Sequence, residues 1–244
     1  MSQIFREVET WGTVIFFEGS SESLTESQLA PAADEIEAFL LHVDEVFSTY
    51  RPESTISQLR GGKISIDDCA EEVRGVWNAT AFARDISAGL FDPWCVEGGY
   101  DPSGYVKGWA ADRAADIFAA HGITECVINA GGDLTVRSSQ PKKIAIANPD
   151  NREEVVHSIL LSHGAVATSG VTERGSHIRD PHTGLIAIGA KSATVWGPDG
   201  GIADALATAL IVSGKDGAGI FAHPQLEGYH CFVIDRNEDY SWSL

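Results

Sequence analysis

The clearest helical pattern lies between about Ala30 and Phe47. Apolar residues there fall three or four positions apart and share one face of a helix: Ile36, Phe39, Leu40, Val43 and Phe47. We also expect helices from about Cys69 to Ala88, from Val106 to Ala120 and from Ile202 to Val212. Gly122 follows the helix expected from Val106 to Ala120 and is a suitable C-terminal stop for it.

The other apolar segments are short and rich in β-formers. One predicted strand, Thr13–Phe17, precedes the first helix, and from Cys126 onward short runs alternate with Gly, Pro and Asn turns: CVIN, LTVR, KIAIA, SILL, AVAT, SATVW and HCFVI. Strands and helices do not alternate regularly, which favours an α+β fold with a largely antiparallel sheet and packed helices. No repeat or low-complexity linker divides the chain, so we expect a single domain over residues 1–244.

The charge balance excludes some classes of partner. The 17 Lys and Arg residues face 35 Asp and Glu, a net charge of −18, without a Lys/Arg-rich run. Nucleic-acid binding by counterion release and polybasic membrane docking are therefore not expected. The sequence MSQIFREVET lacks a basic segment followed by an apolar one, and we find no run of the roughly 20 apolar residues that span a membrane. We expect a cytoplasmic protein without membrane insertion.

The four cysteines do not form a metal or redox motif. They are Cys69, Cys95, Cys126 and Cys231, and no C-x-x-C pair exists among them. We interpret them as buried, inert thiols in a reducing compartment.

Asp204 and Thr208 are the first candidates for chemistry. They stand at positions i and i+4 of the last predicted helix, so their side chains project from one face. A carboxylate and a hydroxyl, completed by carbonyl and phosphate oxygens, suit a hard cation such as Mg²⁺. The spacing alone also fits a structural interpretation, in which Asp204 favours the helix N-terminus and Thr208 bonds a carbonyl of its own helix.

Several Gly-flanked polar segments could bind an anion. The segment DPSGYVKG places Asp101 and Lys107 at a predicted helix start, where backbone N–H groups attract phosphate, although a turn residue and a solvated lysine would give the same pattern. NAGGD, at Asn129–Asp133, is either part of a site or only a tight hairpin. The segment ATSG, which contains Ser169, ends an apolar strand with a turn that lets backbone approach a phosphate or ring. His177 is either a general acid/base or phosphate contact, or an exposed loop histidine.

Common nucleotide motifs are absent from the sequence. The segment IVSGKDGAG lacks the first Gly and the final Ser/Thr of a phosphate-binding loop, and no G-x-G-x-x-G occurs. The ordered set of motifs is more informative. G-T near the N-terminus, FSTYRPESTIS, FDP, D-x-x-G-x-x-KG, NAGGD, ATSG, H-I-x-D-P-x-T-G and ADALAT together resemble the FAD:protein FMN transferase (ApbE-like) family, from Gly12 to about Ile211.

The resemblance implies an activity and a set of residues. It implies an enzyme that cleaves FAD with Mg²⁺, attaches FMN through a phosphoester to a Ser or Thr of an acceptor protein, and releases AMP. It implies side-chain Mg²⁺ ligands at Asp204 and Thr208, with the main-chain carbonyl of Gly104 as a third. His177 and Asp204 are both candidates for the catalytic base. The expected FAD contacts are Tyr50, Phe91, Asp92, Asp101, Lys107, Ser169 and His177.

The chain departs from the family pattern at three places. Trp11 stands where the family usually has Met, which predicts altered packing on the flavin side. Only eight residues separate Asp92 from Asp101, which predicts a more open pocket, and Pro93-Trp94-Cys95 replaces the usual P-T or V-T after FD. Two alternative functions stay open: an FAD pyrophosphatase that releases FMN and AMP, and a binding protein that holds FAD without turnover.

Overall fold

The computed structural model describes residues 1–170, 178–236 and 241–243. Its strands are β1 (Ser2–Thr10), β2 (Thr13–Ser21), β3 (Glu125–Ala130), β4 (Asp133–Asn148), β5 (Asn151–Gly170), β6 (Ala190–Gly197), β7 (His230–Asp235) and β8 (Ser241–Ser243). Its α-helices are α1 (Glu26–Phe47), α2 (Thr55–Arg60), α3 (Glu71–Ile86), α4 (Ser103–Ala120) and α5 (Gly200–Ser213). Short 3-10 helices lie at Ile66–Asp68, Gly214–Ala222 and Pro224–Leu226.

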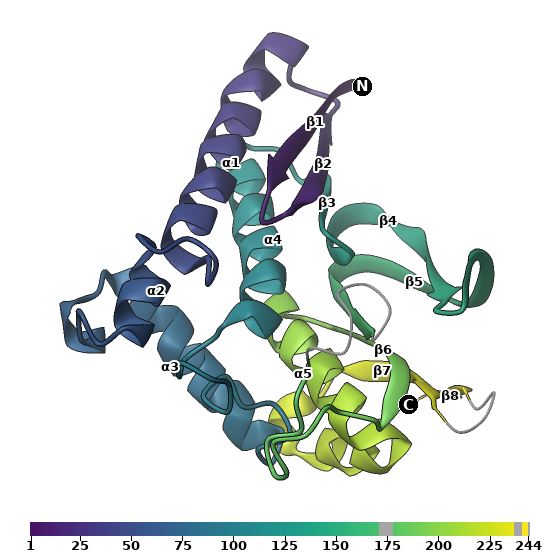
Figure 1. The fold of residues 1–244 in the computed structure, drawn as a ribbon. Helices are drawn as coiled ribbons and strands as arrows, with labels where there is room; N and C mark the ends of the chain where they lie inside the picture. The colour runs from purple at the N-terminus through teal and green to yellow at the C-terminus, as the bar shows by residue number, and fades with distance from the viewer. Residues whose placement is uncertain (171–177, 237–240, 244) are drawn as a thin grey trace.

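The strands form one sheet in which every strand pairs with its neighbour in the chain. The order is β1 to β8, and each described pair is antiparallel. Helices α1 to α4 are inserted between β2 and β3, and α5 between β6 and β7. In Figure 1, α1, α4 and α5 lie along the same side of the sheet, and α3 lies beyond them near α5. The predicted α+β class with a largely antiparallel sheet is therefore confirmed.

Several strands differ from the sequence prediction, among them the short β8, which the sequence did not predict. β1 was not predicted, because its charged outward positions hide a single buried row made of Ile4, Val8 and Thr10. The runs LTVR and KIAIA belong to one strand, β4, and SILL and AVAT to one strand, β5. The pairing register shifts between Arg137 and Lys142, where exposed polar residues interrupt the apolar pattern. Backbone hydrogen bonds continue on both sides of this irregularity, so the strands are longer than their apolar runs.

Three helices, α1, α4 and α5, begin earlier than the apolar pattern indicates, whereas α3 begins at Glu71, slightly after the expected start at Cys69. α1 begins at Glu26 because Thr25 and Gln28 form a capping box, in which the Thr25 N–H donates to Gln28 Oε1 over 2.9 Å. The short helix α2 was not predicted, and it begins where Ser54 Oγ accepts from the Ser57 N–H over 3.0 Å.

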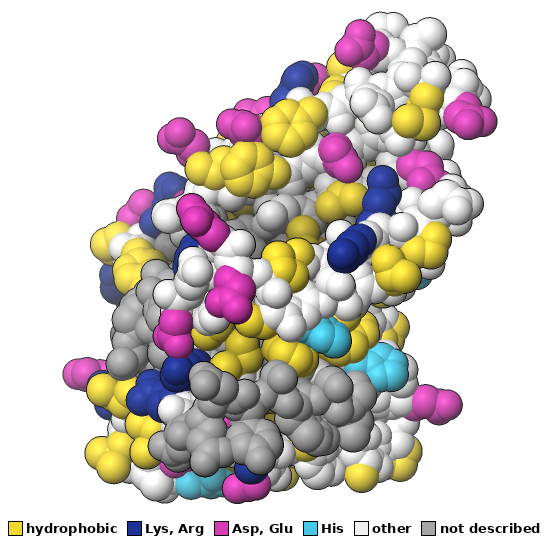
Figure 2. All heavy atoms as spheres, turned by 90° about the vertical axis from the view of Figure 1, so that its right-hand side faces the viewer, with side chains coloured by type: hydrophobic (Ala, Val, Ile, Leu, Met, Phe, Trp, Pro, Cys, Tyr) yellow, Lys and Arg dark blue, Asp and Glu magenta, His cyan; other side chains and the backbone are white. Residues whose placement is uncertain are grey.

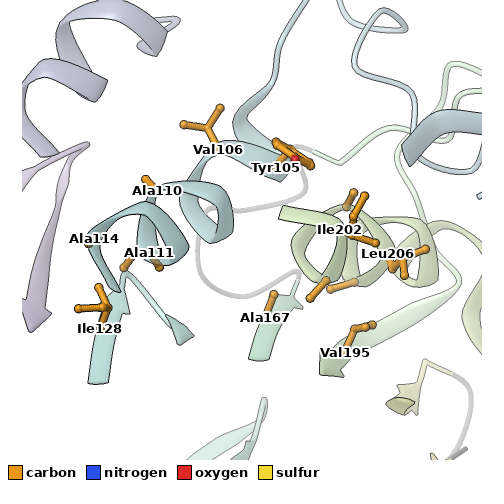
Figure 3. Close-up of a cluster of buried hydrophobic side chains, with 14 of the residues drawn as sticks. Tyr105, Val106, Ala110, Ala111, Ala114, Ile128, Ala167, Val195, Ile202 and Leu206 are labelled. Carbon is orange, nitrogen blue, oxygen red and sulfur yellow. The ribbon is translucent and has the colours of Figure 1, made fainter. Parts of the chain in front are cut away.

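The main core lies between the sheet and the helices. Figure 3 shows side chains of α4, α5 and the strands beneath them pointing into this layer, among them Ala111, Ile128, Ala167, Val195 and Leu206. A smaller hydrophobic cluster lies on the opposite face of the sheet and consists of Ile146, Ile159, Val166 and Phe232. Val166 points to this face because successive side chains of a strand point to opposite faces, and its neighbours in β5 point inward.

A buried carboxylate fastens α4 to α5 and to β4. Asp112 accepts a hydrogen bond from Thr135 Oγ1 over 2.6 Å and from the Gly200 N–H, at the start of α5, over 2.7 Å. Burial raises the pKa of Asp112, while the hydrogen bonds from Thr135 and Gly200 oppose the rise. These contacts fix the start of α5 relative to α4 and β4.

One stretch contradicts the expectation that no segment is apolar enough to span a membrane. Gly200–Ala222 satisfies length and hydropathy criteria for a span. Its first part is α5, in which the residues from Gly200 to Ile211 are buried in the protein core apart from Thr208. We interpret the hydropathy of this stretch as that of a core helix.

Candidate functional site

Two adjoining cavities lie around the N-terminal end of α4. The larger, of about 840 Å³, is bounded by the β1–β2 turn, the C-terminal end of α1 and the loop after it. The smaller, of about 240 Å³, is bounded by residues from the FDP, ATSG and ADALAT motifs. Tyr50, Ser103 and Lys107 line both cavities, so an extended ligand could occupy the two together.

Lys107 joins two buried carboxylates at the boundary of the cavities. Its ammonium contacts Asp133 and lies 3.3 Å from Asp204 Oδ2. Asp133 and Asp204 are only 1% and 2% exposed. Burial raises the pKa of Asp204, and the charge of Asp133 raises it further, whereas Lys107 lowers it. One positive and two negative formal charges meet here, which leaves a net negative charge next to the cavity.

The three predicted cation ligands lie in one place. Gly104 has non-helical angles (φ −86°, ψ 22°) within the first turn of α4, and a methyl group on it would lie 3.1 Å from Thr208 Oγ1 and 3.2 Å from the Phe91 ring. Thr208 Oγ1 lies 3.2 Å from Ser169 Oγ. Asp204 stands one turn before Thr208 in α5, and both line the smaller cavity.

This oxygen-rich group suits a hard divalent cation. A carboxylate, a hydroxyl and a main-chain carbonyl are the donors that Mg²⁺ prefers, and the net negative charge of Lys107, Asp133 and Asp204 together would attract a further cation. Across residues 1–170, 178–236 and 241–243, no cluster of three or more His, Cys, Asp and Glu side chains could hold a metal. A cation at this position would therefore need carbonyl, hydroxyl and ligand oxygens in addition to Asp204.

Arginine side chains orient the two acidic residues of the FDP and DPSG motifs. Asp92 accepts from the Trp94 N–H over 2.8 Å and pairs with Arg84 Nε at 2.9 Å. Asp101 accepts from the N–H and hydroxyl of Ser103, at 2.9 and 2.5 Å. It also lies 3.6 Å from Arg60, at the end of α2. Both carboxylates line the smaller cavity.

The short segment between Asp92 and Asp101 folds onto an aromatic cluster. The ring of Trp94 lies 5.0 Å from Trp77 and 5.3 Å from Tyr100, between ring centroids. The Asp101 N–H donates to the Pro93 carbonyl over 2.8 Å, which closes the segment into a loop. The residues that depart from the family pattern therefore anchor this wall of the smaller cavity. The expected greater openness stays a prediction.

Trp11 shapes the larger cavity from the β1–β2 turn. Its φ of 56° lies in the left-handed region, which bulky side chains rarely adopt, and Gly12 follows with a φ of 68°. Both positions of the two-residue turn have positive φ, the conformation typical of tight hairpins. Among the described residues, Trp11 Nε1 and Thr10 Oγ1 are buried side-chain atoms without a hydrogen-bond partner. Trp11 thus contributes an aromatic surface where the sequence predicted altered packing.

The structure brings most of the predicted site residues together. The smaller cavity is lined by nine of them: Tyr50, Phe91, Asp92, Asp101, Gly104, Lys107, Ser169, Asp204 and Thr208. The tenth, His177, lies outside the described residues, although Ile178 and Arg179 directly after it line the same cavity. Their contacts with FAD or a cation stay predictions.

Asp133 was not among the expected site residues, because the sequence left open whether NAGGD is part of a site or only a tight hairpin. It closes the NAGGD motif, where the Gly132 N–H donates to Asn129 Oδ1 over 2.9 Å in the hairpin that the pattern indicated. Asp133 Oδ1 also accepts from the Thr168 N–H over 3.3 Å, which ties this hairpin to the ATSG motif. An aspartate directly after a Gly-Gly turn was the available signal, but its partner Lys107 is 26 positions away.

Comparisons with known sequences identify the family. A model of the ApbE family matches residues 99–233. The FAD:protein FMN transferase of Rhodobacter capsulatus is 31% identical over 193 residues, 74% of this chain and 34% of that protein. The FAD:protein FMN transferase of Salmonella typhimurium is 34% identical over 126 residues, 46% of this chain and 36% of that protein. The matched segments thus span about a third of the length of these curated relatives.

Solved structures share the fold over nearly the whole chain. An ApbE protein from Thermotoga maritima superposes with a TM-score of 0.82 at 23% identity, over 95% of this chain and 94% of that one. The flavin transferase ApbE from Vibrio cholerae gives a TM-score of 0.80 at 21% identity, over 99% and 96%. At this level of identity the likeness establishes the arrangement of the sheet and helices.

Proposed function

The chain belongs to the ApbE family, and from this membership we propose that it transfers FMN from FAD to a protein. The acceptor group would be the hydroxyl of a Ser or Thr, and AMP would be released. The curated relatives are FAD:protein FMN transferases. The observation that carries the proposal for this chain is the grouping of Asp204, Thr208 and Gly104 beside Lys107 at the boundary of two cavities.

The proposed reaction exchanges one phosphorus–oxygen bond for another. The acceptor hydroxyl oxygen attacks the FMN-side phosphorus of FAD, the bond from that phosphorus to the bridging oxygen breaks, and AMP leaves with the bridging oxygen. The hydroxyl proton passes to a base, for which His177 and Asp204 are the candidates. Asp204, Thr208 and the Gly104 carbonyl would hold Mg²⁺, which when bound would withdraw charge from the pyrophosphate.

The remaining site residues would bind and orient FAD. Tyr50 is 88% exposed and lines both cavities, so its ring is available to cover a bound ligand. Ser169 lies within 3.2 Å of Thr208, at a strand end where backbone can approach phosphate oxygens. Trp11 and Phe47 give the larger cavity aromatic surface suited to a planar ring system.

A single assay distinguishes this function from its alternatives. Purified protein would be mixed with FAD, Mg²⁺ and candidate acceptor proteins, while AMP is quantified and the acceptor mass is measured. AMP together with an acceptor heavier by one FMN less one water supports transfer. AMP with free FMN would identify a pyrophosphatase, and FAD binding without AMP would identify a non-catalytic binding protein.

A further inference from the structure

Lys107 occupies the position beside Asp204 where the proposed site needs a positive charge. Its ammonium contacts both buried carboxylates, Asp133 and Asp204. We propose that the Lys107 ammonium and a divalent cation compete for the Asp204 carboxylate, so that cation binding displaces Lys107 from Asp204. The inference rests on the proposed function only in assuming that Asp204 is a cation ligand.

The geometry allows this exchange without leaving Lys107 unpaired. Its contact with Asp133 is closer than its 3.3 Å separation from Asp204 Oδ2. Asp133 itself is fixed by the Thr168 N–H. Lysine carries a compact charge on a flexible four-carbon stem, which lets the ammonium move while the helix stays in place. Displacement from Asp204 would therefore break the longer of two contacts and keep the shorter one.

The charges favour the same exchange. The side chains of Asp204 and Asp133 are only 3% and 2% exposed. Their negative charges are therefore compensated by nearby cations and not by water. One ammonium compensates only one of the two formal charges. A divalent cation at Asp204, with Lys107 kept at Asp133, would give each carboxylate a cation of its own.

The exchange has a consequence for anion binding. Lys107 lines both cavities, so an ammonium displaced from Asp204 can turn toward an anionic ligand there while it stays near Asp133. A bound pyrophosphate would favour the released position of Lys107 and would thereby strengthen cation binding. By linkage the cation would strengthen anion binding by the same factor.

The test measures cation binding alone, without FAD or acceptor. Mn²⁺ would be titrated into the purified protein and free Mn²⁺ followed by electron paramagnetic resonance. Lys107→Met removes the competing charge and keeps a similar chain length. We expect it to bind Mn²⁺ at least about tenfold more tightly than the unsubstituted protein, as removal of a unit charge a few ångströms from the ligand implies. Lys63→Met, on an exposed residue, is the matched control and should change nothing.

A double variant separates direct competition from the effect of net charge. It also keeps the test possible if Lys107→Met alone fails to fold. Lys107→Met with Asp133→Asn removes one positive and one negative charge, so the net charge of the cluster is unchanged and no second buried carboxylate is left unpaired. Direct competition predicts that this double variant still binds Mn²⁺ more tightly than the unsubstituted protein. Equal affinity would mean that only net charge matters and would overturn the proposal.

The remaining outcomes separate this inference from the proposed function. If the unsubstituted protein binds Mn²⁺ and Lys107→Met binds it equally or more weakly, the competition is disproved and the cation site stands. If neither the unsubstituted protein nor any of the variants, Asp204→Asn included, binds Mn²⁺ at millimolar concentration, the cation site itself is wrong, and the competition fails with it.

Discussion

The backbones of Gly108 in α4 and Gly200 in α5 are in direct contact. A methyl group on Gly200 would lie 2.6 Å from the Gly108 carbonyl oxygen, and one on Gly108 would overlap the Gly200 carbonyl. This close approach places Lys107, next to Gly108, within reach of Asp204, one turn into α5. The two glycines therefore set the geometry of the site as well as the helix packing.

Gly108→Ala should disturb both stability and activity. The added methyl group forces the helices apart, and we expect a loss of about 1–3 kcal/mol in the free energy of unfolding, measured by urea denaturation. Flavin transfer should fall further than this loss explains, because Lys107 and Asp204 separate.

Gly75→Ala is the matched control for this substitution. Gly75 lies inside α3, and a methyl group on it would meet no atom within 4 Å. The better helix propensity of alanine should there stabilise the protein by about 0.5–1 kcal/mol. A Gly108→Ala variant as stable as the Gly75→Ala variant would contradict the packing argument.

Asp204→Asn should abolish turnover while the fold survives. The neutral amide loses the charge that would hold a divalent cation at a phosphate-binding site. Thr208→Val should cost less, since it removes one neutral ligand. AMP release at low Mg²⁺ is the measurement, and Asp216→Asn, on an exposed residue, is the control. Wild-type activity of Asp204→Asn under these conditions would refute the cation assignment.

His177→Ala separates proton transfer from ligand contact. If the ring moves a proton, the maximal rate should fall by about 10²-fold to 10⁴-fold. Weaker FAD binding with an unchanged maximal rate would instead leave only a contact role. His182→Ala, five positions along and exposed, is the control for a general effect of removing a histidine from this region.

Much of this site follows from local sequence, and the remainder depends on the tertiary fold. The i, i+4 spacing placed Asp204 and Thr208 on one helix face because helical periodicity is local. Gly104 meets Thr208 only because α4 and α5 cross, and that crossing depends on residues about a hundred positions apart. Asp133 was missed for the same reason, since its partner lies on a helix that precedes its hairpin.

The fold class was predictable from the order of helical and β-rich patterns, whereas strand length was not. Buried and exposed positions alternate along β1, whereas four consecutive residues of β5, from Gly164 to Ala167, are buried and the residues from Ser139 to Lys143 of β4 are all exposed. Backbone pairing does not require apolar side chains, so the strand continues through a segment that the sequence marks as polar.

Cys95 should be the first cysteine to react with an alkylating reagent. It lines the smaller cavity and is partly exposed, whereas Cys69, Cys126 and Cys231 are buried. Burial raises the pKa of Cys95, and Asp92 raises it further, so the thiolate fraction is below that of a free cysteine at the same pH. Alkylation at neutral pH should therefore be slow, and it should accelerate as pH rises.

Intact-mass measurement after iodoacetamide treatment checks this expectation. The native protein should gain one label and the urea-unfolded protein four, and Cys95→Ser should remove the native label. Bound FAD should slow the reaction if the smaller cavity holds it. Rapid labelling of Cys126, whose pKa burial raises to about 12, would contradict the structure.

The acceptor protein should present a neutral or basic surface around its hydroxyl. The chain carries a net charge of −18, and Figure 2 shows acidic side chains spread over the whole height of one face. Juxtaposed like charges slow encounter and weaken binding, so a strongly acidic acceptor is disfavoured. A short segment between Asp92 and Asp101 should leave room for a folded acceptor to offer its Ser or Thr on an exposed loop.

Salt should therefore slow flavin transfer. Screening over a Debye length of about 8 Å at 0.15 M ionic strength removes the attraction between unlike surfaces. The measurement is the transfer rate to the acceptor at increasing NaCl, with FAD and Mg²⁺ saturating so that their own binding does not limit the rate. Cleavage of FAD without acceptor, followed through AMP in the same series, controls for direct effects of salt on the site. A transfer rate that rises steadily with ionic strength would reveal repulsion between the partners and disprove the predicted surface.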